Sequence, residues 1–147
     1  MSSFVPHFAF GATIGVIAAG ASIPLVDTPT VATIVTPLIT GIMGALTPDM
    51  DIKSKSSQIM YLIFLSISIY FFFTDRIDLA FLTLLYSIIP QFFAHRGFIH
   101  SFIFGVISAV GLYFALTELL LFQNESALIA SVSYLTGFLS HKLLDEV

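Results

Sequence analysis

The chain has 147 residues, of which 57% are hydrophobic and 10% charged, with a net charge of −4 and a mean hydropathy of +1.01. Soluble globular proteins carry roughly 25% charged residues, and a chain of this length cannot bury so much apolar surface within itself. The composition therefore excludes an ordinary soluble domain and indicates one membrane-embedded domain over residues 1–147. The absence of cysteine excludes disulfides and thiolate zinc sites.

Six apolar segments follow one another along the chain. The N-terminus MSSFVPH has no basic region before the first of them, so we expect no cleaved signal peptide. Lipid offers no partner to a backbone N–H or C=O group, and each segment should therefore form a helix. The predicted helices are residues 8–26, 31–46, 58–73, 79–94, 98–122 and 127–144. We expect an all-α integral membrane protein, a bundle of about six transmembrane helices.

The basic residues between these segments predict the orientation of the bundle. With the N-terminus inside, four of the five basic residues face the cytoplasm, and only Arg76 lies outside. This bias follows the positive-inside rule and predicts an inner-membrane protein with both termini cytoplasmic. All four histidines then fall at the cytoplasmic face, together with Asp49, Asp51 and Asp145.

Three stretches at that face carry imidazole or carboxylate groups. His7 begins the first segment, as a ligand or as an ordinary interfacial residue. In TPDMD, Asp49 and Asp51 stand two apart after a helix end, a pattern typical of a cation site or of a solvated turn. In HKLLD, His141 and Asp145 are four apart and share one helix face. They suit two ligands of one metal, a ligand with its supporting carboxylate, or a solvated helix end.

The stretch HRGFIHS joins the fourth and fifth segments. A turn at Gly97 would let His95 and His100 face one point. Arg96 is a candidate for holding a phosphate or carboxylate of a substrate. The alternative is an interfacial loop whose polar groups meet lipid headgroups.

Taken together, these residues predict a metal site at the cytoplasmic face. Imidazole and carboxylate ligands without thiolates suit zinc first, with manganese or magnesium as alternatives. Seven candidate ligands exceed the four of one tetrahedral zinc, which leaves one or two ions open. The candidate ligands are His7, Asp49, Asp51, His95, His100, His141 and Asp145.

The order and spacing of these motifs resemble a known family. His near the start, PDxD after the second segment, HRGxxHS between the fourth and fifth, and GxLSHxxxD near the end are similar to the membrane-bound metal-dependent hydrolases of the YdjM-like, LexA-regulated group. The resemblance implies a hydrolase whose polar positions bind metal. A weaker likeness to the helical zinc phospholipase C and nuclease group favours phosphoesters. Family members continue past HxxxD, so substrate contacts from such a tail are expected to be absent here.

The resulting hypothesis is a membrane-embedded, phospholipase-like hydrolase of a phosphoester. Arg96 would neutralise developing negative charge, and Asp49 or Asp51 could accept a proton from the attacking water. Expected partners are membrane lipid and a phospholipid or other phosphoester substrate, without nucleic acid. A divalent-metal or proton transporter and a non-catalytic protein with a structural metal are the alternatives.

One further pattern concerns packing rather than chemistry. Gly11 and Gly15 form a GxxxG sequence on the first segment. Such a pattern is typical of close helix packing, either within the bundle or between two copies of the chain. A homodimer is therefore a candidate assembly.

Overall fold

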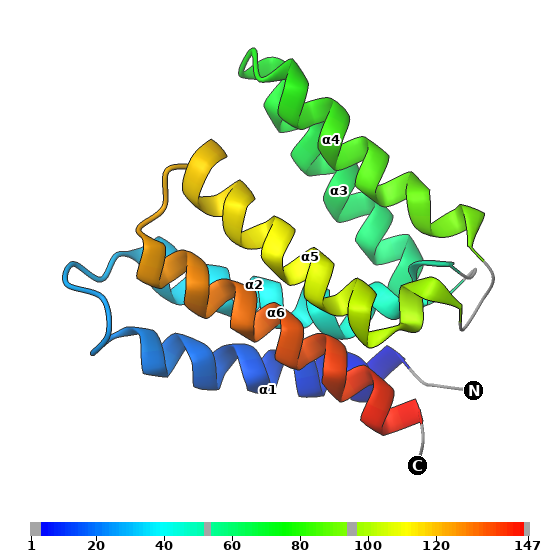
Figure 1. Ribbon diagram of the computed structural model, residues 1–147, viewed down its shortest axis with the longest axis horizontal. Coiled ribbons are helices and arrows are strands. Elements are labelled where there is room, and N and C mark those ends of the chain that lie inside the picture. The colour runs from blue at the N-terminus through cyan, green and yellow to red at the C-terminus, as the bar shows by residue number, and fades with distance from the viewer. Residues whose placement is uncertain (1–3, 52–53, 94–96, 146–147) are drawn as a thin grey trace.

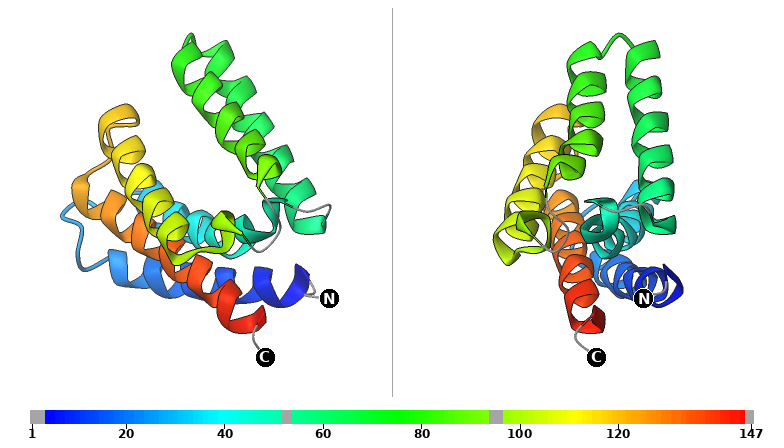
Figure 2. Two further views of the ribbon diagram at one scale, coloured as in Figure 1. Left: turned by 45° about the vertical axis from the view of Figure 1, so that its right-hand side comes forward. Right: turned by 90° about the vertical axis from the view of Figure 1, so that its right-hand side faces the viewer.

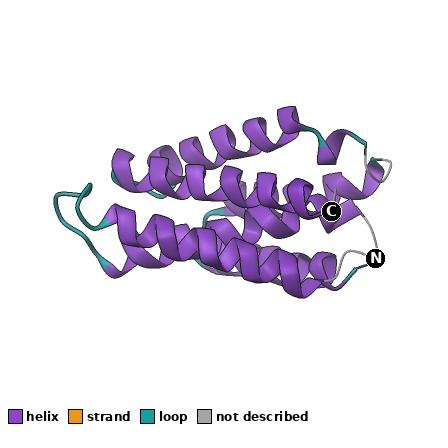
Figure 3. Ribbon diagram, turned by 90° about the horizontal axis from the view of Figure 1, so that it is seen from below, coloured by secondary structure: helices purple, strands orange, loops and turns teal. Residues whose placement is uncertain are grey.

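The computed structural model describes residues 4–51, 54–93 and 97–145, and these residues form helices without any strand (Figure 3). The α-helices are α1 (Phe4–Ser22), α2 (Val31–Leu46), α3 (Lys55–Phe73), α4 (Ile77–Ile88), α5 (Phe102–Phe114) and α6 (Asn124–Asp145). Short 3-10 or π segments are η1 (Thr47–Asp51), η2 (Ile89–Phe92), η3 (Phe98–His100) and η4 (Ala115–Leu119). The prediction of an all-α protein with six main helices is confirmed for the described residues.

Helix boundaries differ from the predicted segments where prolines and capping residues act. The first helix ends at Ser22 instead of residue 26, because Pro24 disfavours helical backbone at the residue before it and cannot continue the helix. The predicted segment 98–122 is divided rather than continuous. The Ser101 hydroxyl accepts the backbone N–H of Phe104 and so starts α5 with an N-cap.

Helices α1, α2 and α6 lie side by side and form the closest-packed part of the molecule (Figure 1). A Cβ added to Gly11 would lie 2.8 Å from the carbonyl oxygen of Gly41, and one added to Gly137 would lie 2.2 Å from the same oxygen. A Cβ on Gly15 would lie 2.6 Å from Cα of Leu38. The GxxxG pattern of α1 therefore packs against α2 within the chain, the first of the two predicted alternatives.

Helices α3 and α4 form a hairpin that leans away from this layer (Figure 2). Two buried side chains in the first half of α3, Met60 and Phe64, pack against Leu46 and Met50 where α2 passes into η1. The ring of Tyr86 on α4 lies 5.2 Å from that of Phe64. The hairpin thus meets the rest of the bundle mainly beside η1.

Within the described residues, five helices are long and apolar enough to cross a membrane, while the sixth, Ile77–Phe92, is apolar but shorter. Large apolar side chains are exposed along all of them, as expected of helices that face lipid. Helix α1 begins and α6 ends at one end of the bundle, where η1 and η3 also lie (Figure 1). The described polar residues singled out in the sequence gather at this end: His7, Asp49, His100, His141 and Asp145.

Candidate metal centre

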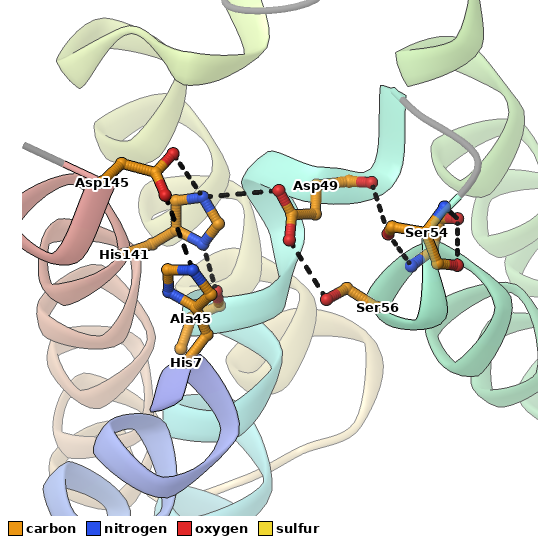
Figure 4. A network of polar contacts seen from close by, with 8 residues as sticks. His7, Ala45, Asp49, Ser54, Ser56, His141 and Asp145 are labelled. Atoms are coloured by element: carbon orange, nitrogen blue, oxygen red, sulfur yellow. Dashed lines mark hydrogen bonds and ion pairs between the residues drawn. The ribbon is translucent and has the colours of Figure 1, made fainter. Parts of the chain in front are cut away.

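Five of the predicted site residues come together from four elements. His7 lies on the first turn of α1, Asp49 on η1, His100 at the end of η3, and His141 and Asp145 on the last turns of α6. Figure 4 shows His7, Asp49, His141 and Asp145 turned toward one another. His7 is 1% exposed, His141 is fully buried and Asp49 is 4% exposed. Imidazole and carboxylate groups this deeply buried need a partner.

His141 is the centre of the group. Its Nδ1 lies 2.8 Å from the backbone carbonyl oxygen of Ala45. A carbonyl only accepts, so Nδ1 carries the proton and donates it. The other nitrogen, Nε2, lies 3.5 Å from Oδ1 of Asp49 and 3.4 Å from Oδ2 of Asp145. Among the described residues, Nε2 of His141 has no hydrogen-bond partner.

These distances can be compared with those expected for a metal and for a proton at Nε2. A protonated imidazole would draw a carboxylate oxygen to about 2.7–2.9 Å. Ligands of a tetrahedral zinc, with bonds of about 2.0–2.1 Å, lie about 3.3–3.4 Å apart. The separations from Nε2 to Asp49 and Asp145 are close to the second spacing. The residues therefore fit a small divalent cation better than a simple ion pair.

His7 adds a second imidazole to the same group. Its Nε2 lies 3.6 Å from Oδ1 of Asp145, and its ring is stacked on that of His141 with centroids 4.0 Å apart. Protonating both stacked rings would place two positive charges against each other. A shared cation with two neutral imidazoles would avoid this repulsion, and the nearby carboxylates would neutralise its charge.

His100 completes a second set of donors. Nitrogen or oxygen atoms of Asp49, His100 and His141 lie within 4.8 Å of one another, as do those of His7, His141 and Asp145. The ring of His100 meets that of His141 edge-on, with centroids 5.8 Å apart. Both sets include His141, whose only available nitrogen is Nε2. The two sets therefore meet at His141.

Two supporting contacts were not predicted from the sequence. The backbone carbonyl of Ala45 fixes the tautomer of His141, and Oδ2 of Asp49 accepts a 3.1 Å hydrogen bond from the hydroxyl of Ser56. Such outer contacts orient metal ligands. The run KSKSS, which includes Ser56, is typical of a solvated loop and helix cap, and a carbonyl leaves no mark in a sequence.

The remaining predicted site residues are not placed by the structure. His95 and Arg96 lie outside the described residues. Asp51 ends η1, but its side chain is outside the described part of the chain. Whether a turn at Gly97 aims His95 and His100 at one point stays a prediction.

Comparison with known proteins identifies the family. The YdjM inner membrane protein family matches residues 1–147, the whole sequence. The chain belongs to this family. No curated protein and no solved structure matches it. The match confirms the resemblance to the YdjM-like family and, with the five long apolar helices, supports a location in the inner membrane.

Proposed function

We propose that this protein is a membrane-embedded, metal-dependent hydrolase that cleaves a phosphoester at the cytoplasmic face of the inner membrane. The observation that carries the proposal is the environment of His141. Its Nδ1 is held by a backbone carbonyl, while its buried Nε2 faces oxygens of Asp49 and Asp145 at 3.5 and 3.4 Å. A divalent cation satisfies these three groups together.

The donor set favours zinc and a single ion. Imidazoles with carboxylates and no thiolate suit zinc, with manganese or magnesium as alternatives. One imidazole nitrogen binds one ion, so the two donor sets that share His141 count as one site. Four of His7, Asp49, His100, His141 and Asp145 are enough for a tetrahedral zinc. The fifth would support the ion from outside or give way to substrate.

The residues around the ion divide into binding and chemical roles. A bound divalent ion would supply a Lewis acid that polarises a phosphoryl oxygen and activates water. Asp49, or Asp51 on the same short helix, would accept the proton of the attacking water. Arg96 would offset the negative charge that develops on the phosphoryl group. His7 and His141 would hold the ion and exclude water from its inner side.

The position of the site suits a lipid substrate. His7, Asp49 and His141 are buried, whereas the side chain of Asp145, the last residue of α6, is 18% exposed. Large apolar side chains are exposed on the surrounding helices, as expected of helices that face lipid. A phospholipid could therefore present its phosphate to this end without leaving the membrane. Another phosphoester anchored in the membrane could reach the site in the same way.

The proposal is tested by metal binding and turnover in purified protein. We expect about one zinc per chain, and its removal by a chelator should abolish hydrolysis of phospholipid in mixed micelles or of a chromogenic phosphodiester. His141→Ala should lose the metal, because Nε2 belongs to both donor sets. His100→Ala should retain more of it, because His7 and Asp145 remain. A protein that carries no divalent metal, with unchanged metal content in His141→Ala, would refute the proposal.

Transport is the main rival function, and the deeper polar residues do not favour it. Thr40 and Ser133 are buried between α2 and α6, but their hydroxyls donate to the carbonyl oxygens of Ala130 and Pro37 at 2.7 and 2.8 Å. Hydroxyls bonded in this way strengthen helix packing. They are not ionisable groups of the kind that mark a path for an ion or a proton through a membrane protein. Zinc uptake into sealed vesicles without hydrolysis would reverse this preference.

A further inference from the structure

The carboxylate of Asp49 has two oxygens with different neighbours. Oδ1 lies 3.5 Å from Nε2 of His141, and Oδ2 accepts a 3.1 Å hydrogen bond from the hydroxyl of Ser56. Both residues are almost fully buried, with 4% of Asp49 and 1% of Ser56 exposed. Figure 4 shows the Asp49 carboxylate between His141 and Ser56.

We propose that Ser56 is a positioning residue of the candidate metal centre, whose hydroxyl holds Oδ2 of Asp49 and so keeps Oδ1 directed at the ion. This inference rests on the proposed function, because it requires a metal at His141. It adds α3, the first helix of the hairpin, to the elements that build the site.

Asp49 needs such an anchor because of its place in the fold. It lies on η1, a 3-10 segment of five residues, and the carboxylate torsion of Asp is broad. A second contact comes from Ser54, whose hydroxyl donates to the backbone carbonyl oxygen of Asp49 over 3.4 Å. The N-terminus of α3 also favours a negative charge beside it. The start of α3 therefore fixes the backbone and the carboxylate of Asp49.

The arrangement repeats what Ala45 does for His141. In each case the atom that does not face the ion is hydrogen-bonded to a neighbouring group: Nδ1 of His141 donates to the carbonyl of Ala45, and Oδ2 of Asp49 accepts from the hydroxyl of Ser56. Loss of such an outer contact commonly weakens metal affinity by about 10–100-fold. Ser56 should thus affect affinity without touching the metal.

Ser57 provides a matched control. It is also a serine in the first turn of α3, and it is also 1% exposed. Its hydroxyl donates to the backbone carbonyl oxygen of Ser54 at 2.9 Å and accepts the backbone N–H of the same residue. Removing either hydroxyl should disturb the start of α3, but only Ser56 contacts the predicted ligand.

The experiment measures zinc affinity by competition with a chromogenic chelator in the purified full-length protein. We expect Ser56→Ala to weaken zinc binding by about 10–100-fold. Ser57→Ala should change it by less than about threefold, and Ser56→Thr, which keeps the hydroxyl, should restore most of the affinity. Thermal unfolding of the metal-free variants shows how much stability each serine contributes without the ion.

A double-mutant cycle separates positioning from general damage. If Ser56 acts through Asp49, then Ser56→Ala should have no further effect on zinc affinity when added to Asp49→Asn. Equal losses in Ser56→Ala and Ser57→Ala, or additive losses in the double mutant, would overturn the role of Ser56 while leaving the metal centre in place. A wild-type protein that binds no divalent metal would refute the metal centre itself.

Discussion

The layer of α1, α2 and α6 and the hairpin of α3 and α4 are built in different ways. In the layer, glycines let backbones approach so closely that an added Cβ at Gly44 would lie 2.0 Å from the carbonyl oxygen of Tyr134. In the hairpin, most of the surface is apolar and exposed, and its contact with the layer is confined to a few side chains. We infer that the layer is the more rigid part of the bundle and that the hairpin is more loosely attached.

The predicted ligands follow this division. His7, His141 and Asp145 lie on the layer itself, and Asp49 lies on the segment that continues α2. The hairpin supplies the serine hydroxyls that hold Asp49. In lipid, close backbone packing is a principal source of helix association. A metal site that needs fixed ligand positions is therefore best placed where the backbones are least free to move.

The largest effect is expected from filling the space between the backbones of α2 and α6. In Gly137→Ala the new methyl group would lie 2.2 Å from the carbonyl oxygen of Gly41 and 3.1 Å from the backbone nitrogen of Ala45. Backbone cannot yield as a side chain does, so we expect a destabilisation of about 3 kcal/mol or failure to fold. Zinc content should fall as well, because Ala45 holds His141.

Gly20→Ala is the matched control for this substitution. Gly20 is also helical, but a Cβ there would meet no atom within 4 Å. Alanine should leave the melting temperature unchanged or raise it slightly. Thermal unfolding in detergent and elemental analysis measure both variants. Equal melting temperatures for Gly137→Ala and wild type would contradict the close packing of the layer.

An intermediate effect is expected where the hairpin is attached to α5 and α6. The hydroxyl of Tyr86 lies 3.2 Å from that of Ser108 and 3.0 Å from that of Tyr134, which in turn donates to Thr47 over 3.1 Å. Tyr86→Phe removes the α4 hydroxyl from this chain. We expect a loss of about 1 kcal/mol in stability, without a large change in zinc affinity.

Tyr70→Phe is the control for Tyr86→Phe. It shows whether the loss of stability comes from this attachment or from removing any tyrosine hydroxyl on α3 or α4. Tyr70 is on α3 of the same hairpin and is largely exposed. Its replacement should leave stability unchanged. Ser56→Ala and Tyr86→Phe should then show opposite patterns, since the first affects mainly metal affinity and the second mainly stability. A large loss of zinc binding in Tyr86→Phe would contradict this separation.

The architecture and the polar end of the bundle are predictable from the sequence because both follow from strong, local signals. Apolar segments in lipid must be helical, and segments of alternating direction return the polar loops to one end. Hydropathy and loop charge alone are therefore enough to group His7, Asp49, His100, His141 and Asp145 at one end. The grouping depends only on which segment ends lie on the same side of the membrane. It can be predicted without knowing how the helices pack.

Packing and short-range contacts are less predictable. The division of segment 98–122 depends on the cap at Ser101, a single hydroxyl within a long apolar run. The lean of the hairpin and the role of Ser56 depend on which helix faces which, and hydropathy does not encode this in a membrane. GxxxG on α1 indicates close packing but leaves the partner helix open.

The smallest effect is expected from removing a large side chain that faces lipid. Phe73, at the end of α3, is 80% exposed. Phe73→Ala should change stability by less than about 0.5 kcal/mol, as for a surface position without special contacts. Phe138 on α6 is the control, because it is fully buried and packs with Ile99 and Phe104. Its replacement by alanine leaves a cavity and should cost roughly 3 kcal/mol. Comparable losses from the two substitutions, measured by unfolding in detergent, would mean that the hairpin end is covered by another chain and that the contrast with the layer does not hold in the assembled protein.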